Sequence, residues 1–258
     1  MNAPLALELS GVHKRFVAVE AVRGVSLSIR AGERVALIGP NGAGKTTLFN
    51  CISGALRPDR GQIQLHEARI DGLAAHRIYR RGLARSFQVS SLFDGLSVID
   101  NLRCAILWSQ GMGHAFWTLL DRAHGLTARC EELLDQLGLS GRRDTLASAL
   151  SYAEQRSLEI GLAVAGGAHT LLLDEPTAGM SRSETLRTVD LIRSLSEGRT
   201  LLMVEHDMSV VFDLADRVAV MVAGELIAFD TPQAIRRDAR VQQAYLGGLA
   251  EIDAVAHD

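Results

Sequence analysis

The sequence of 258 residues contains few cysteines, few aromatic side chains and no excess of positive charge. Its cysteines, Cys51, Cys104 and Cys130, are odd in number and lack C-x-x-C spacing, which argues against a disulfide framework or a zinc site and fits a reducing compartment. The formal net charge of −3 argues against nonspecific nucleic-acid binding, which usually needs a basic face. Residues 1–10 lack the charged start, long apolar stretch and cleavage site of a secretory signal.

Long hydrophobic runs are also missing. The most apolar stretch, Cys104 to Leu120, is interrupted by Gln110, His114 and two glycines. It is shorter than the roughly 20 residues that span a bilayer. We expect this stretch to be a buried or interface segment, and the chain to be soluble by itself.

Apolar residues and glycine are plentiful, which favours an α/β protein with buried parallel strands and tight strand-to-helix turns. Short alternating or apolar runs predict strands, and runs of helical spacing separate them. The N-terminal third is predicted to form short strands, and residues 89–166 to form a helical insertion. The predicted strands are 25–29, 34–38, 62–66, 170–173, 200–204, 217–222 and 226–229, and the predicted helices include 45–54, 131–138 and 183–196.

The strongest local signal is a glycine-rich segment between the strand at 34–38 and the following helix. It matches the P-loop pattern at every position: Gly39, Pro40, Asn41, Gly42, Ala43, Gly44, Lys45, Thr46 and Thr47. Glycine lets backbone N–H groups turn inward around phosphate, and the helix directs its positive end at the same anion. Lys45 is then placed to contact the β- and γ-phosphates and Thr46 to ligate Mg²⁺. The segment predicts a nucleoside triphosphate site.

A second acidic signal follows the apolar run Thr170 to Leu173. Open α/β sheets bind ligands at the carboxyl ends of their strands, where Asp174 and Glu175 stand. Asp174 is interpreted as holding Mg²⁺ through a water molecule, and Glu175 as the general base that polarises the attacking water. The alternative for Glu175 is a solvated carboxylate at a helix start, before Pro176.

Two further polar residues have no clear meaning in isolation. His206, after the strand at 200–204, follows the acidic strand and is placed to bond the γ-phosphate, although a lone histidine is more often structural. Gln88, in the segment Ser86-Phe87-Gln88, is equally open by itself.

Together these residues resemble the nucleotide-binding subunit of ABC transporters, over nearly the whole chain. The family carries its motifs in the order Walker A, Q-loop, signature, Walker B, D-loop and H-loop. The matching segments here are Gly39 to Thr47, Gln88, Leu150 to Arg156, Leu171 to Glu175, Ala178 to Ser181 and His206. The segments 150–156, 204–208 and 244–247, and the C-terminal extension, resemble the larger ATPase subunit of branched-chain amino acid importers. Subunits for urea import and lipopolysaccharide export are similar as well.

The resemblance implies that two such domains pack head to tail, with each ATP between one subunit's P-loop and the other's signature. The partner's nucleotide would then be contacted by Ser151, Ala153 and Glu154. The residue types of Ser151 and Glu154 also predict a capping box at the start of a helix that continues through Ala165. Phe16 matches the family's adenine-stacking aromatic; the alternative is a side chain packed in the β-subdomain. Gln88 would contact the metal and link the γ-phosphate to the helical subdomain.

Two positions depart from the family pattern. Ala153 stands where the signature has glycine, and Ser181 where the D-loop ends in a carboxylate or amide. An added methyl can push the backbone away from phosphate, so we hypothesise a slower composite site, to be tested with Ala153→Gly. A tolerated substitution at a helix start is the alternative.

The expected fold is therefore a P-loop α/β (RecA-like) core with an N-terminal antiparallel β-subdomain. The nucleotide-binding domain is expected at 1–249, with its helical subdomain at 89–166 and a C-terminal helical extension at 231–249. Residues 250–258 are expected to form a flexible tail.

The expected function is ATP hydrolysis coupled to solute import, with ATP and Mg²⁺ bound. The expected partners are transmembrane permease subunits, a second ATPase subunit and a solute-binding protein, with no nucleic acid. The second ATPase subunit is either another copy of this chain or a different chain, and the altered signature favours a heterodimer of different chains. The expected location is the cytoplasmic face of the cell membrane. Other classes carry weaker support: a soluble ABC ATPase acting on nucleic acid, a P-loop kinase or GTPase, and a nucleotide-binding regulator without hydrolysis.

Overall fold

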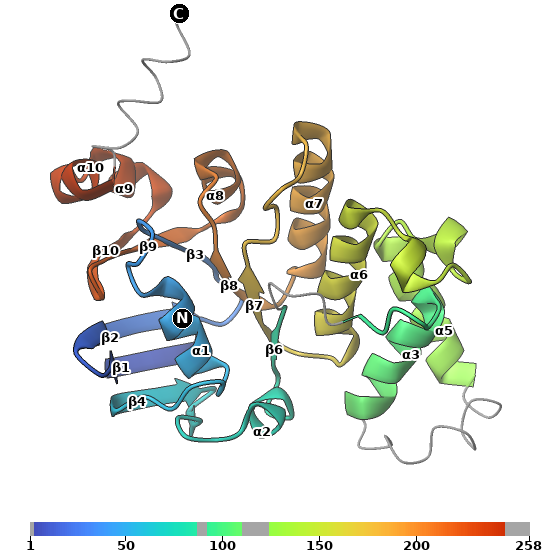
Figure 1. Cartoon of the computed structure of the whole chain (residues 1–258), viewed down its shortest axis with the longest axis horizontal. Helices are drawn as coiled ribbons and strands as arrows, with labels where there is room; N and C mark the ends of the chain where they lie inside the picture. The colour runs from blue at the N-terminus through green and yellow to red at the C-terminus, as the bar shows by residue number, and fades with distance from the viewer. Residues whose placement is uncertain (1–2, 87–91, 110–123, 246–258) are drawn as a thin grey trace, which may run out of the picture. The chain divides into compact units, whose positions relative to one another are not determined.

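The computed structural model describes residues 3–86, 92–109 and 124–245 (Figure 1). Its residues group into two compact units. One unit combines the N-terminal residues up to Ile78 with those from Thr200 onward, and the other is Tyr79–Arg199. The chain therefore leaves the first unit once and returns to it.

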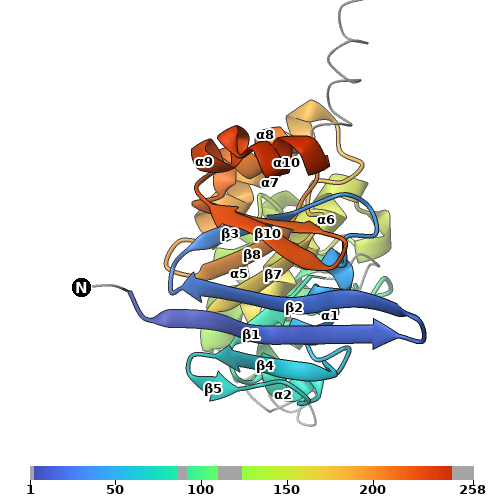
Figure 2. The same ribbon diagram turned by 90° about the vertical axis from the view of Figure 1, so that its left-hand side faces the viewer.

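The first unit contains an antiparallel sheet in the strand order β2-β1-β4-β5 (Figure 2). Its strands are β1 (Leu5–Phe16), β2 (Val19–Arg30), β4 (Arg60–Leu65) and β5 (Ala68–Arg69). Alternate residues of β2 are buried, as predicted for 25–29. The prediction of short strands is wrong for β1 and β2, which have 12 residues each. Register shifts such as the one between Leu9 and Val12 break the period of two, so the long strands are hard to see in the sequence.

The first unit also contains parallel strands that support the candidate site. Strand β3 (Arg34–Ile38) lies between β8 (Thr200–Val204) and β9 (Arg217–Val222), and all three run parallel. The three strands have the predicted bounds and are almost wholly buried, which is typical of parallel strands. The predicted strands at 217–222 and 226–229 are confirmed, and they form a hairpin, because β10 (Glu225–Asp230) pairs antiparallel with β9.

The helices of the first unit lie on both sides of these strands. Helix α1 (Lys45–Ile52) is beside β2, while α9 (Pro232–Arg237) and α10 (Ala239–Tyr245) lie against β10 (Figures 1 and 2). The Arg236 guanidinium stacks 3.8 Å from the ring centroid of Phe212, which joins α9 to α8 (Met208–Leu214). A short helix, α2 (Ala75–Tyr79), spans the boundary between the two units.

The second unit is mostly helical around two parallel strands, β6 (Leu83–Arg85) and β7 (Thr170–Asp174). Its α-helices are α3 (Val98–Ser109), α5 (His124–Gln136), α6 (Tyr152–Ala165) and α7 (Arg182–Leu195), with short 3₁₀ turns at Ser140–Arg142 and Ala147–Ala149. Helix α6 packs between α3 and α7 (Figure 1). The predicted helical character of residues 92–166 is confirmed where the structure describes them. Within those described ranges, no helix is both long and apolar enough to cross a membrane.

Candidate functional site

The glycine-rich loop between β3 and α1 adopts backbone conformations that favour glycine. The φ angles are +152° at Gly39, +79° at Gly42 and +97° at Gly44. A Cβ at Gly39 would lie 2.0 Å from the Met221 carbonyl oxygen, and one at Gly44 would lie 2.1 Å from the Ala21 carbonyl oxygen. Glycine is therefore required where the loop touches the backbones of β9 and β2.

Hydrogen bonds hold the same loop in shape. The Gly224 N–H donates to the Ala43 carbonyl at 3.0 Å, and the Ala43 N–H donates to the Pro40 carbonyl at 3.1 Å. The Lys45 ammonium folds back over the loop and donates to the carbonyls of Gly39 (2.6 Å) and Pro40 (3.1 Å). A positive charge thus lies against the loop that the sequence assigns to phosphate.

The N-terminal end of α1 adds to this positive character. The first turn of α1 carries no acidic residue that would offset the helix dipole. Asn41, Gly42 and Thr46 are exposed, and Thr47 is half-buried. The loop and the start of the helix therefore present N–H groups and hydroxyls to solvent, an arrangement suited to an anion.

His206 leaves the sheet at the same edge as the loop. Leu37 of β3 lies opposite Val204 of β8 in a parallel register, so the segments that follow both strands begin side by side. The His206 side chain is 64% exposed. The backbone N–H of His206 donates at 3.1 Å to the carboxylate of Glu205, which is buried. The structure thus brings His206 and the P-loop to one edge of the parallel strands.

Phe16, at the end of β1, is 44% exposed. The Lys14 ammonium lies 5.7 Å from its ring centroid. Phe16 is therefore partly covered and partly exposed, so it is not a core residue, and its stacking on adenine stays a prediction.

In the second unit, Asp174 ends β7 with only 1% of its surface exposed. Its Oδ2 accepts a hydrogen bond from Arg85 Nη2 at 2.9 Å. Its Oδ1 is buried and has no hydrogen-bond partner within the described part of the chain. An orphaned carboxylate oxygen is costly to bury, and carboxylate oxygens are the ligands that Mg²⁺ prefers. Asp174 therefore fits the role of a cation ligand.

Glu175 follows in a left-handed conformation with φ of +47° and is half-buried. Arg156 Nη2 donates to the carbonyls of Asp174 (2.7 Å) and Glu175 (3.0 Å). Arg85 has no predicted role, and Arg156 is predicted only as the last residue of the signature segment. The available signals were weak: Arg85 ends a short apolar strand, and Arg156 lies between Gln155 and Ser157 in the polar first part of α6.

The predicted capping box at the start of α6 is confirmed. Ser151 Oγ accepts the Glu154 N–H at 3.4 Å, and Glu154 Oε2 accepts the Ser151 N–H at 2.8 Å. The hydrogen bond from the Ser151 N–H lowers the pKa of Glu154, and the Arg142 guanidinium, 2.9 Å away, acts in the same direction against the effect of burial. The box uses two N–H groups of this terminus, so a phosphate here would meet the remaining first-turn N–H groups and the Ser151 hydroxyl.

The two residues that depart from the family pattern both lie at helix starts. Ser181 is the N-cap of α7, where the Glu184 carboxylate accepts its N–H at 2.8 Å and its hydroxyl at 2.6 Å. Serine thus has a local structural role at this position. Ala153 lies in the first turn of α6, and its carbonyl accepts the Ser157 hydroxyl at 3.0 Å.

The predicted site residues divide between the two units. The P-loop, Phe16 and His206 belong to the first unit; Asp174, Glu175 and the capping box of α6 belong to the second. Gln88 lies outside the described residues.

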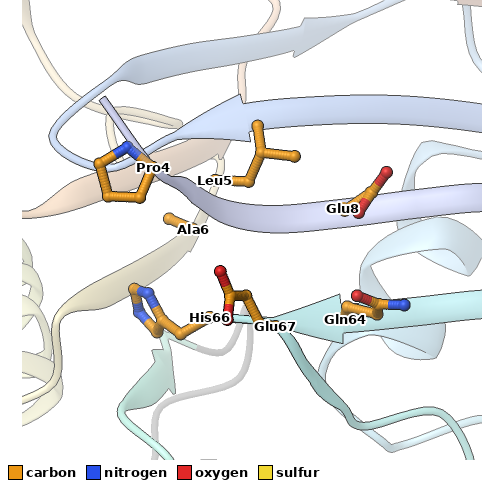
Figure 3. A pocket seen from close by; sticks show the side chains of 7 residues that line it. All are labelled: Pro4, Leu5, Ala6, Glu8, Gln64, His66 and Glu67. Carbon is orange, nitrogen blue, oxygen red and sulfur yellow. The ribbon is translucent and has the colours of Figure 1, made fainter. Parts of the chain in front are cut away.

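A pocket of about 250 Å³ lies on β1 and the turn after β4 (Figure 3). His66 and Glu67 form this turn with φ angles of +46° and +66°. The pocket includes none of the predicted site residues; its lining is Pro4, Leu5, Ala6, Glu8, Gln64, His66 and Glu67.

Comparison with known proteins agrees with this geometry. A family model described as ABC transporter matches residues 22–178, and one described as branched-chain amino acid ATP-binding cassette transporter matches residues 225–251. The chain is 40% identical over 255 residues to the high-affinity branched-chain amino acid transport ATP-binding protein LivG of Salmonella typhimurium, covering 96% of this chain and 99% of the relative. It is 37% identical over 254 residues to the corresponding protein BraF of Pseudomonas aeruginosa, with the same coverage.

A solved structure of similar fold is the ADP conformation of an ATP-binding cassette of an ABC transporter. It has a TM-score of 0.81 and 26% identity, and the likeness covers 94% of this chain and 99% of that one. The expected P-loop fold with an antiparallel β-subdomain is thereby confirmed. The chain therefore belongs to the ABC transporter family, as an ATP-binding and ATP-hydrolysing subunit.

Proposed function

We propose that this chain is the ATPase subunit of an importer for branched-chain amino acids or a related small solute. The named relatives match over nearly their whole length, and the C-terminal residues match the family model for branched-chain amino acid cassettes. Its partners are transmembrane permease subunits, a second ATPase subunit and a solute-binding protein, and it works on the cytoplasmic face of the membrane. Residues 1–249 act as one nucleotide-binding domain, with a helical subdomain at 89–166 and an extension at 231–249.

The observation that carries the proposal is the placement of Lys45 against a glycine loop at the start of α1. On binding ATP, the Lys45 ammonium exchanges its bonds to loop carbonyls for bonds to the β- and γ-phosphates. The N–H groups of the loop contact the remaining phosphate oxygens. The exposed ring of Phe16 stacks on adenine, and His206 donates to the γ-phosphate.

Mg²⁺, when bound, neutralises charge on the β- and γ-phosphates. Three residues would hold it: Thr46, Gln88 and Asp174. Asp174 would act through Oδ1, which has no hydrogen-bond partner within the described residues. Gln88 also links the γ-phosphate to the helical subdomain, so that the presence of ATP changes the position of that subdomain. Arg85 keeps the other oxygen of Asp174 occupied, so that only one oxygen is left for the cation.

Glu175 takes a proton from the attacking water while the water oxygen bonds to the γ-phosphorus. The bond from that phosphorus to the β–γ bridging oxygen breaks, and ADP leaves with this oxygen. Ser151, Ala153 and Glu154 contact the ATP held by the P-loop of the second ATPase subunit. ATP closes the pair of subunits and hydrolysis reopens it, which is the two-state change passed to the permease.

The Glu175→Gln variant of the assembled transporter tests this proposal. We expect turnover to fall by about 10²- to 10⁴-fold, the usual contribution of a general base, while MgATP binding and ATP-dependent subunit pairing persist. The control is Glu197→Gln, which changes an exposed carboxylate in the turn after α7. Normal turnover in Glu175→Gln would remove Glu175 from the catalytic role.

The solute is tested in vesicles that contain the permease subunits with solute-binding protein. We expect ATP-driven uptake of leucine, isoleucine or valine, and no uptake of urea. Uptake of urea alone would overturn the assignment of the solute and leave the ATPase assignment intact.

A further inference from the structure

Arg156 joins helix α6 to the end of strand β7 through a buried guanidinium. The residue is only 6% exposed. Nη1 donates to Glu159 Oε2 at 2.8 Å, one turn along α6. Nη2 donates to two main-chain carbonyls, those of Asp174 at 2.7 Å and Glu175 at 3.0 Å.

These two carbonyls belong to the peptide planes on either side of the Glu175 Cα. A donor that bonds to both planes restrains φ and ψ of Glu175 and with them the direction of its Cα–Cβ bond. The second plane has no N–H of its own, because the next residue is Pro176. Its carbonyl is therefore its one hydrogen-bonding group, and it accepts both Arg156 Nη2 at 3.0 Å and the Ala178 N–H at 3.2 Å. Of these two donors, only Arg156 also bonds to the plane before Glu175.

The restraint from Arg156 acts on a residue with an unfavourable backbone conformation. Glu175 has a φ of +47°, a left-handed conformation that a non-glycine residue rarely adopts. Such conformations persist when the surrounding structure over-determines them, and they cluster at functional sites. Two charge-assisted hydrogen bonds from one guanidinium are contacts of that kind.

Stabilisation of α6 alone does not explain the arrangement. An i,i+3 ion pair needs no burial, as the exposed pair Arg193–Asp190 on α7 shows. Arg156 and Glu159 are both nearly fully buried, which carries a desolvation cost for each charge. What burial adds here is the contact of Nη2 with the end of β7.

We propose that Arg156 is a positioning residue that holds Glu175 in its left-handed conformation and so aims the carboxylate at the attacking water. Glu159 keeps the guanidinium in place from the other side. The inference rests on the proposed role of Glu175 as general base.

The test uses the full chain assembled with its membrane partners. In Arg156→Met/Glu159→Met both charges are removed together, so no charge is left buried without a partner. We expect kcat to fall by about 100-fold, the scale reported for a misplacement of about 1 Å in an active site, with KM and MgATP affinity unchanged. Arg156→Lys should show a smaller loss of kcat, because a lysine keeps the charge but not the planar fork. The control Arg193→Met should turn over normally.

The decisive measurement combines these changes with Glu175→Gln. A residue that acts through Glu175 adds no further loss of turnover once that carboxylate is gone, whereas an independent structural role adds its full loss. Additive losses, or a normal kcat in both Arg156 variants while Glu175→Gln is inactive, would overturn this inference alone. Normal turnover in Glu175→Gln would instead sink the proposed base and this inference with it. If the paired Met variant does not fold, Arg156→Lys at an unchanged melting temperature carries the same comparison.

Discussion

The P-loop offers a comparison between two glycines that differ in one physical respect. Gly42 and Gly44 both have left-handed φ angles, +79° and +97°. A Cβ at Gly42 would meet nothing within 4 Å, whereas one at Gly44 would lie 2.1 Å from the Ala21 carbonyl oxygen of β2. Gly42→Ala therefore introduces backbone strain alone, and Gly44→Ala introduces the same strain and a collision with main chain.

The two variants should differ in the unfolding free energy that they lose. A left-handed alanine costs about 1–2 kcal/mol relative to glycine in either position. Forcing an extra carbon against packed backbone costs about 1–3 kcal/mol more, so Gly44→Ala should lose about 2–5 kcal/mol of unfolding free energy. At roughly 3 °C per kcal/mol for a chain of this size, the melting temperature should fall by about 10 °C for Gly44→Ala and about 4 °C for Gly42→Ala.

The assay is thermal unfolding of the full chain followed by circular dichroism. It is run without nucleotide, because a ligand that binds only the folded state would shift both midpoints. Equal losses in the two variants would show that the close approach of the loop to β2 has no energetic consequence, contrary to this prediction.

Three further predictions follow from local chemistry. Hydrogen bonding lowers the pKa of Glu154 in the folded chain, so its ionised form stabilises the fold above the ordinary pKa of 4.5, and this stabilisation is lost as the pH falls below that value. In urea unfolding at a series of pH values, Glu154→Gln should therefore lose less stability towards acid than the unchanged chain, and parallel curves would contradict this. In the turn after β4, His66→Asn/Glu67→Gly should raise the unfolding free energy by about 1 kcal/mol, because Asn-Gly suits a turn with two positive φ angles. ATPase activity should not change, and a lower melting temperature of the double variant would contradict this prediction. Brief iodoacetamide treatment at neutral pH should label Cys104 before Cys51, because of the three cysteines only Cys104 is partly exposed. Burial raises the pKa of both thiols, that of Cys51 to about 11, so labelling of both is slow, and mass spectrometry that finds Cys51 labelled first would contradict this.

Local features of this chain were predictable because the residues that make them are neighbours in sequence. The capping box of Ser151 and Glu154 forms between positions three residues apart, so its residue types suffice to predict it. The strand before Gly39 and the helix after Lys45 follow from an apolar run, a glycine-rich turn and helical spacing. The long strands β1 and β2 were harder to predict, since their register shifts interrupt the alternation on which such predictions depend.

The contacts that shape the site depend on residues far apart in the chain. Arg85 reaches Asp174 across 89 positions, and Arg156 reaches the carbonyl of Asp174 across 18. Neither contact has a sequence pattern of its own, because each exists only once β6, β7 and α6 have packed together.

The chemical groups of the site are thus visible in the order of the residues: a phosphate loop, two acidic residues after an apolar strand, and a histidine after another strand. How these groups are held depends on the folded chain. It leaves one oxygen of Asp174 without a partner, places the Ala21 carbonyl where only glycine fits, and restrains Glu175 in a left-handed conformation. The physical reason is that residue type sets what a side chain can bind, whereas packing between distant segments sets where it points and what it has already bound.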